Sequence, residues 1–148
     1  MEFHILGPVD VTRDSNRVEF QAVNAPDLHQ RASREFAERL GLIRDEQWKL
    51  PTPCADWDVQ ALVHHLVYEN VWTPPLMAGQ TVEEIGDRFE GDILGDDPKG
   101  AYAAAAATAV ASIHEDGAME RTVHLSFGDF PGHEYTMQLF ADHLIHAW

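Results

Sequence analysis

The sequence has a single cysteine, Cys54, among its 148 residues. One cysteine excludes an internal disulfide framework and a thiolate-rich zinc cluster, and it favours a cytoplasmic location. Long apolar runs are also missing, so no segment reaches the length of a transmembrane helix. The first eleven residues lack the basic segment of a signal peptide. We therefore expect a cytoplasmic protein with no membrane partner.

Positive charge is scarce as well. Ten Lys and Arg residues face 25 Asp and Glu residues, which gives a formal net charge of −15. Phosphate binding needs a basic surface, so nucleic acid is excluded as a partner. Seven of the acids lie between Glu83 and Asp97. We expect a solvated loop or frayed helix there, because a second cation site would lack the spacing of a calcium loop.

Apolar residues are present in the amount that a packed core needs. Their share is 45%, and the chain length suits one domain. Apolar side chains recur at helical spacing in four stretches. The expected helices cover residues 24–48, 59–72, 101–115 and 135–148, with a short strand at 121–127 closed by a turn at 128–132. The predicted fold class is therefore all-α, a four-helix bundle with a long connection between its second and third helices.

Residues 1–22 differ from this pattern. Apolar residues alternate around two turns there, which is typical of short strands or a β-hairpin. The stretch Met1–Val11 weakly resembles the opening strands of the winged-helix domain of streptomycete antibiotic regulatory proteins. No recognition helix follows it. We divide the chain into a leader, residues 1–22, and a bundle, residues 23–148, that is a candidate for truncation at its C-terminal end.

The last predicted helix carries the clearest chemical signal. Asp142 and His146 are four residues apart, so a helix places both on one face. A carboxylate and an imidazole in this arrangement suit one divalent metal ion, although an ordinary helix pair has the same spacing. The second helix offers a third ligand. His65 shares a stripe with Glu69 that we expect to face inward, whereas His64 points about 100° away. The alternative for His65 is a core histidine satisfied by hydrogen bonds.

Three protein ligands would leave open positions on the metal, as catalytic sites require. The ion would carry +2 against one carboxylate, so an anionic fourth ligand is favoured. A thiolate suits zinc in that position. Cys54 itself lies in a proline-rich connection, where a packing role and a place at the mouth of the site are both open.

Two sequence motifs resemble one protein family. Residues 51–67, with His64-His65-Leu66-Val67, are similar to the second-helix motif of actinobacterial metal-binding proteins related to the mycothiol-dependent maleylpyruvate isomerase N-terminal domain. Residues 140–148 are similar to the last-helix motif of these DinB-like bundles. The resemblance implies that His65, Asp142 and His146 are the ligands. It also implies a low-molecular-weight thiol cofactor such as mycothiol, with Zn²⁺ as the expected metal and Ni²⁺ as the alternative.

Two departures from the family pattern matter. The carboxylate is Asp142 where the isomerase pattern has Glu, and the family continues beyond the position of Trp148.

Glu69, one turn from His65, is the candidate proton acceptor, with a plain surface role as its alternative.

Three functions remain open from the sequence: a thiol-dependent transferase or isomerase, a metal-dependent hydrolase, and a non-catalytic metal-binding module. The expected partners are a small-molecule electrophile or thiol. A homodimer is also left open.

Overall fold

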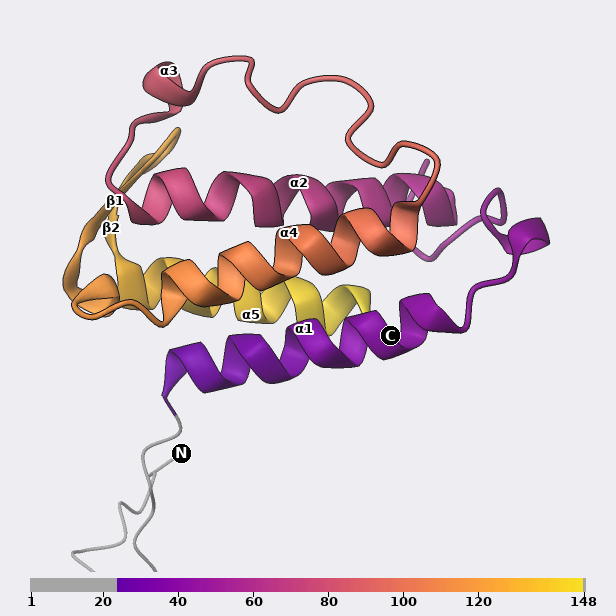
Figure 1. Cartoon of the computed structure of the whole chain (residues 1–148), viewed down its shortest axis with the longest axis horizontal. Coiled ribbons are helices and arrows are strands. Elements are labelled where there is room, and N and C mark those ends of the chain that lie inside the picture. The colour runs from indigo at the N-terminus through magenta and orange to yellow at the C-terminus, as the bar shows by residue number, and fades with distance from the viewer. Residues whose placement is uncertain (1–23, 148) are drawn as a thin grey trace, which may run out of the picture.

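Four long helices make up most of the computed structural model, which describes residues 24–147 (Figure 1). They are α1 (Ala25–Gly41), α2 (Val59–Met77), α4 (Pro98–Ile113) and α5 (Gly132–His146). Helix α2 packs mainly against α4, and α1 packs mainly against α5. Figure 1 shows that α2 and α4 run in the same direction, so the chain returns along the bundle between them. The predicted all-α four-helix bundle with a long second connection is confirmed.

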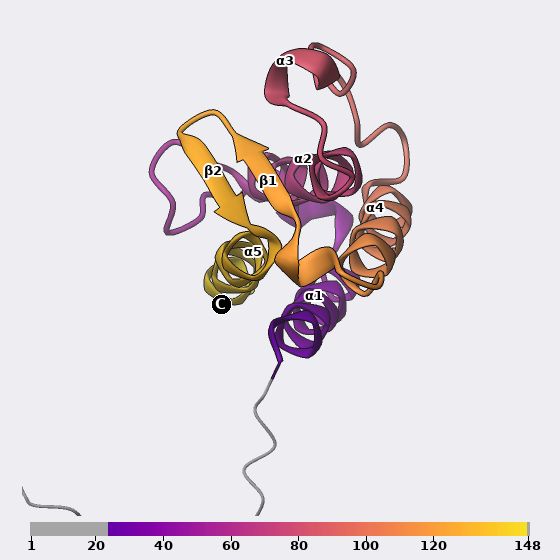
Figure 2. The same cartoon turned by 90° about the vertical axis from the view of Figure 1, so that its left-hand side faces the viewer.

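Shorter elements connect the long helices. Two 3₁₀ turns cover Asp45–Gln47 and Ala118–Glu120, and helix α3 covers Val82–Ile85. Strands β1 (Thr122–Leu125) and β2 (Gly128–Pro131) form an antiparallel hairpin before α5 (Figure 2). Within residues 24–147, no helix combines the length and apolarity needed to cross a membrane. The predicted leader, residues 1–22, lies outside the described residues.

Side-chain caps fix where the helices begin. The Asn24 side chain accepts a hydrogen bond from the backbone of Asp27 at the start of α1. The Asp58 side chain accepts one from the backbone of Ala61 at 2.8 Å and thereby caps α2. Each cap satisfies a backbone N–H that has no partner inside its helix. The Asp58 cap sets the start of α2, and with it the position of His65.

The predicted end of the first helix near Trp48 is wrong, because α1 ends at Gly41. Glycine is a poor helix former, and the chain turns away directly after it. Ile43 and Trp48 nevertheless pack against the core from the following loop. Because these two residues are buried, the apolar spacing in the sequence continues beyond Gly41, and it predicted a helix that was too long.

The predicted end of the second helix before Pro74 is also wrong. Helix α2 continues through Pro74 and Pro75 to Met77. Both prolines lie in the last turns, and each removes one helical hydrogen bond because it has no backbone N–H. Leu76 and Met77 are 4% and 0% exposed, respectively. Burying these two side chains contributes about 3–6 kcal/mol, which is of the same order as the cost of about 3 kcal/mol for each proline.

The turn expected at residues 128–132 is instead strand β2 and the first residue of α5. Helix α5 therefore begins three residues before Tyr135, the expected start. Gly132 permits this start, since a Cβ atom there would overlap the carbonyl oxygen of Ala118. Helix α4 also begins three residues before residue 101, its expected start, because Pro98 is its first residue, behind the cap Asp97.

The core consists of two apolar clusters with buried polar residues between them along α2. One cluster contains Phe36, Val63 and Leu66, and the other contains Leu76 and Leu139. Between the two clusters lies a set of polar side chains at 0% exposure, which we call the polar layer. The polar layer consists of His29, Asn70, Thr73, Thr136 and His143.

Candidate metal centre

Three side chains from two helices meet near one end of the bundle. They are His65 of α2 with Asp142 and His146 of α5, and one ligand atom from each lies within 4.8 Å of the others. His65 Nε2 is 3.0 Å from Asp142 Oδ2, and His146 Nε2 is 3.3 Å from Asp142 Oδ1. Both imidazoles thus direct Nε2 at one carboxylate, and each uses a different oxygen. We call these residues the His/Asp cluster.

The polar layer fixes α2 against α5 next to this cluster. The Asn70 side-chain amide lies 3.4 Å from His143 Nε2, and His143 Nδ1 lies 2.9 Å from the Leu139 carbonyl oxygen. A carbonyl accepts only, so Nδ1 carries the proton and Nε2 accepts from the Asn70 amide. His143 follows Asp142 directly. This bond therefore restrains the rotation of α5 that turns Asp142 and His146 towards α2.

A closed loop covers the cluster from outside. The Thr52 backbone N–H and hydroxyl both donate to the Trp57 carbonyl oxygen, each at 3.0 Å. Trp57 consequently lies over the cluster, with its ring centroid 5.0 Å from that of His65 and 5.8 Å from that of His146. The same loop brings Cys54 Sγ to 3.7 Å from His146 Nδ1. The loop thus supports the outer side of His146 and limits water around the cluster.

The contacts between His65 and Asp142 shift the pKa values of both groups. The hydrogen bond that His65 donates to Asp142 raises the pKa of His65, although partial burial opposes this rise. Burial alone would raise the pKa of Asp142, but the bond from His65 and the nearby histidine charges outweigh it and leave that pKa lowered. Ionised carboxylate is therefore the preferred state of Asp142, which is the state that binds metal.

Glu69 lies one turn beyond His65 on α2. Burial raises the pKa of its carboxyl group, the charge of His65 opposes this rise, and the charge of Asp142 adds to it. A carboxylate with a raised pKa is a better proton acceptor near neutral pH than an exposed one. Glu69 therefore lies next to the His/Asp cluster with a carboxyl group whose pKa is raised.

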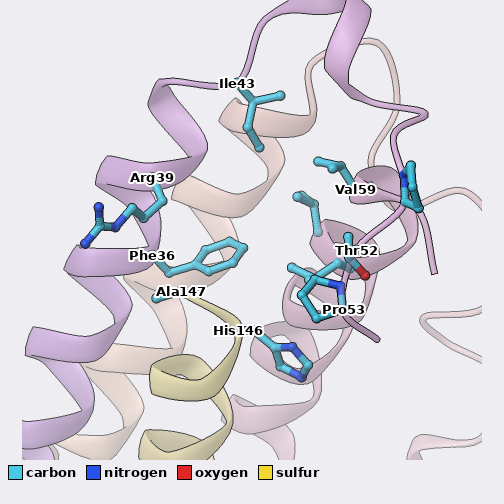
Figure 3. A pocket seen from close by; sticks show the side chains of 11 residues that line it. Phe36, Arg39, Ile43, Thr52, Pro53, Val59, His146 and Ala147 are labelled. Atoms are coloured by element: carbon cyan, nitrogen blue, oxygen red, sulfur yellow. The ribbon is translucent and has the colours of Figure 1, made fainter. Parts of the chain in front are cut away.

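A cavity of about 540 Å³ opens beside His146 (Figure 3). We call it the His146 cavity. Its walls are mostly apolar and come from α1, the loop at Pro51–Pro53, the start of α2 and the end of α5. Phe36, Val59 and Leu62 are among them, and Arg39 lies at its rim. A volume of this size accommodates a small organic molecule next to the cluster.

The comparison with known families decides where this bundle belongs. The family model of the mycothiol maleylpyruvate isomerase N-terminal domain matches residues 29–148. The chain belongs to this family. The match includes α2 and α5, which carry every residue of the His/Asp cluster, and it confirms the resemblance found in the sequence motifs.

Two similar relatives of this family member are uncharacterized proteins of Mycobacterium tuberculosis, from strains CDC 1551 and H37Rv. Each is 32% identical over 124 residues, which cover 81% of this chain and 62% of the relative. The chain thus spans less than two thirds of the length of these relatives. No solved structure matches it significantly.

The bundle brings together the three residues that the sequence predicted as ligands and keeps the adjacent histidine apart. His64 directs its Nε2 at the carbonyl oxygen of Gly91, 3.3 Å away, on another side of α2. Cys54 lies against His146 rather than in simple loop packing. Among residues 24–147, the cluster is the one group of three or more His, Cys, Asp or Glu side chains with metal-ligand spacing. A second cation site in the acidic stretch is therefore not supported.

Sequence reasoning missed Trp57, Asn70 and His143. Trp57 lies in the motif of residues 51–67 that resembles the family, and this resemblance was the one indication in the sequence that Trp57 contacts the site. Asn70 interrupts the apolar run of α2, and a polar residue at a buried helical position indicates a partner on another helix. That partner, His143, is 73 residues away in sequence and could be found only in the folded bundle.

Proposed function

We propose that this family member binds one divalent metal ion through His65, Asp142 and His146. The single observation that supports it is the convergence of three ligand atoms within 4.8 Å of one another. Zn²⁺ is the first candidate, because two imidazoles and a carboxylate are common zinc ligands, and Ni²⁺ is the alternative. Such a set leaves at least one position open for a substrate or cofactor.

The chemistry of the donor atoms fits such an ion. Each of the two Nε2 atoms lies against one oxygen of the Asp142 carboxylate, and Asp142 favours its ionised form. His146 has its second nitrogen against Cys54, which supports the orientation of the ring. Asp142 is shorter than the Glu of the isomerase pattern by one methylene. Its direct contact with both histidines supports the view that this shorter reach is sufficient.

We further propose that the reaction is a thiol-dependent transfer or isomerisation, with mycothiol or a similar thiol as cofactor. A divalent ion in the cluster would supply a Lewis acid that lowers the pKa of a thiol held beside it. Glu69 would accept the thiol proton, and the sulfur would then form a bond to an electrophilic carbon. In a transfer the leaving group would depart with the electron pair of the bond broken at that carbon, whereas in an isomerisation the π electrons of a conjugated double bond would move onto its carbonyl oxygen and return when the thiolate leaves. The His146 cavity would receive the apolar part of the electrophile. A free thiol cofactor suits a reducing compartment, so we place the protein in the cytoplasm.

Cobalt substitution tests this function directly. Sulfur ligation to Co²⁺ produces an intense near-ultraviolet charge-transfer band, so titrating a low-molecular-weight thiol into the cobalt form should raise that band. Asp142→Ala should weaken the signal, whereas His64→Ala, which removes the adjacent histidine, should leave it unchanged. If no thiol alters the spectrum while hydroxide does, the thiol-dependent reaction is wrong and metal-assisted hydrolysis takes its place.

A further inference from the structure

A second cavity, of about 300 Å³, lies farther along α2 than the His/Asp cluster, and Glu69 is one of the residues that line it. We call it the Glu69 cavity. Its walls come from the second half of α2, the start of α5 and the tip of the hairpin between β1 and β2. It shares no lining residue with the His146 cavity. The two cavities are therefore separate binding spaces, and the thiol chemistry proposed above uses Glu69 alone among the residues that line this one.

Aromatic rings form much of its wall. Tyr68 and Trp72 of α2, Phe127 at the hairpin tip and Tyr135 of α5 all line it. The Tyr68 and Trp72 rings are tilted against each other, with centroids 5.7 Å apart. Phe127 is 70% exposed, which is unusual for a large apolar side chain that lies over a cavity. Rings from three elements thus surround a small space that is open to solvent.

The charge of this wall has one sign. Glu69 is the one charged residue among those that line the cavity. A second carboxylate lies close by, since the Tyr68 hydroxyl donates to Glu90 Oε1 at 3.1 Å. Arg88, a neighbouring cation, lies over the Phe89 ring at 5.8 Å and donates to Gln80, so it is engaged outside the cavity wall. When Glu69 is ionised, the cavity therefore favours cations over anions.

We propose that the Glu69 cavity binds the methylated ammonium group of a small organic cation. The faces of aromatic rings attract such a group through their quadrupoles, and walls of several rings suit quaternary ammonium ligands in particular. Glu69 supplies the counter-ion at the inner end. A bare metal ion would need several oxygen ligands, and a primary amine would need several hydrogen-bond acceptors, whereas this wall offers mainly carbon. The bound cation would also keep Glu69 ionised beside the His/Asp cluster.

Choline and its uncharged isostere 3,3-dimethyl-1-butanol are the matched probes. We would titrate each into the full chain by calorimetry, first as purified and then after treatment with a metal chelator. Choline should bind at least about tenfold more tightly than the neutral isostere in both cases, because its charge is the main difference. Binding after chelation separates this proposal from the metal centre, since none of the metal ligands lines the cavity.

Three variants test the assignment of residues. Glu69→Gln should weaken choline binding about tenfold while leaving the neutral isostere unchanged, and Glu35→Gln, which removes an exposed acid of α1, is its control. Trp72→Leu should weaken choline binding by roughly fivefold to thirtyfold. Phe127→Ser removes a ring that is mostly exposed, so folding should survive, and binding should weaken severalfold. Absence of choline binding, equal binding of the isostere, or an unchanged affinity in Glu69→Gln would each overturn the proposal.

Discussion

His29 of α1 gives the sharpest prediction about stability. Its side chain is 0% exposed, and neither ring nitrogen has a hydrogen-bond partner within residues 24–147. Its ring packs edge-on against His143 of α5, with centroids 5.1 Å apart. Burial, then the charges of His143 and of His114 at the end of α4, lower the pKa of His29 from 6.5 to about 3. The folded protein therefore holds this imidazole neutral.

The sign of the pH dependence follows from that lowered pKa. Between pH 6.5 and about pH 3 the unfolded chain binds a proton at His29 that the folded chain does not bind. The free energy of unfolding must therefore fall as the pH falls through this window, by at most about 1.4 kcal/mol per pH unit. From pH 7.5 to pH 4.5 the loss from this one residue amounts to roughly 2.5 kcal/mol.

Urea unfolding at several pH values, with a chelator present to remove any metal contribution, measures this effect. In His29→Leu the two nitrogens without partners disappear, so the variant should gain on the wild type by roughly 2.5 kcal/mol between pH 7.5 and pH 4.5. Other titrating groups are common to both chains and cancel in the difference. His133→Leu, which removes an exposed histidine of α5, should retain the wild-type slope. Parallel curves for wild type and His29→Leu would refute this account of the polar layer.

Three further predictions concern the packing that positions the cluster. Asn70→Ala should lower the free energy of unfolding by about 1–3 kcal/mol in urea titrations, because it leaves buried His143 Nε2 without its donor; a change below about 0.5 kcal/mol would contradict this role. Gly132→Ala should lower the thermal midpoint strongly, since its Cβ would overlap the Ala118 carbonyl oxygen, whereas Gly41→Ala, with open space around it, should not; equal midpoints would contradict the close approach. Asp58→Ala should cost about 0.5–2 kcal/mol through loss of the α2 cap, and an unchanged urea midpoint would contradict that role.

Local patterns were sufficient to predict the bundle and the cluster candidates. The four-residue spacing of Asp142 and His146 and the helical stripe of His65 are properties of single helices, which sequence periodicity reports directly. Helix ends were harder to predict. Burial of Ile43 and Trp48 extended the apolar pattern past α1, and burial of Leu76 and Met77 carried α2 through two prolines. In both places tertiary packing, rather than local propensity, decided the outcome.

The surroundings of the cluster depend on contacts between distant segments. Two polar residues of α2, Asn70 and Thr73, are fully buried. Their burial is tolerated because α5 supplies His143 and Tyr135 as partners. Trp57 reaches the two histidines only because the loop closes between Thr52 and Trp57. No periodicity in the sequence records such pairings.

The central claim is that His65, Asp142 and His146 hold one divalent ion. Zinc titration of the metal-free protein by calorimetry tests it most directly, with His64→Ala as the control for loss of a neighbouring histidine. Wild type and His64→Ala should each bind about one ion per chain. His65→Ala and His146→Ala should bind at least about a hundredfold more weakly, since each loses a ligand. One ion per chain at wild-type affinity in both ligand variants would contradict the claim.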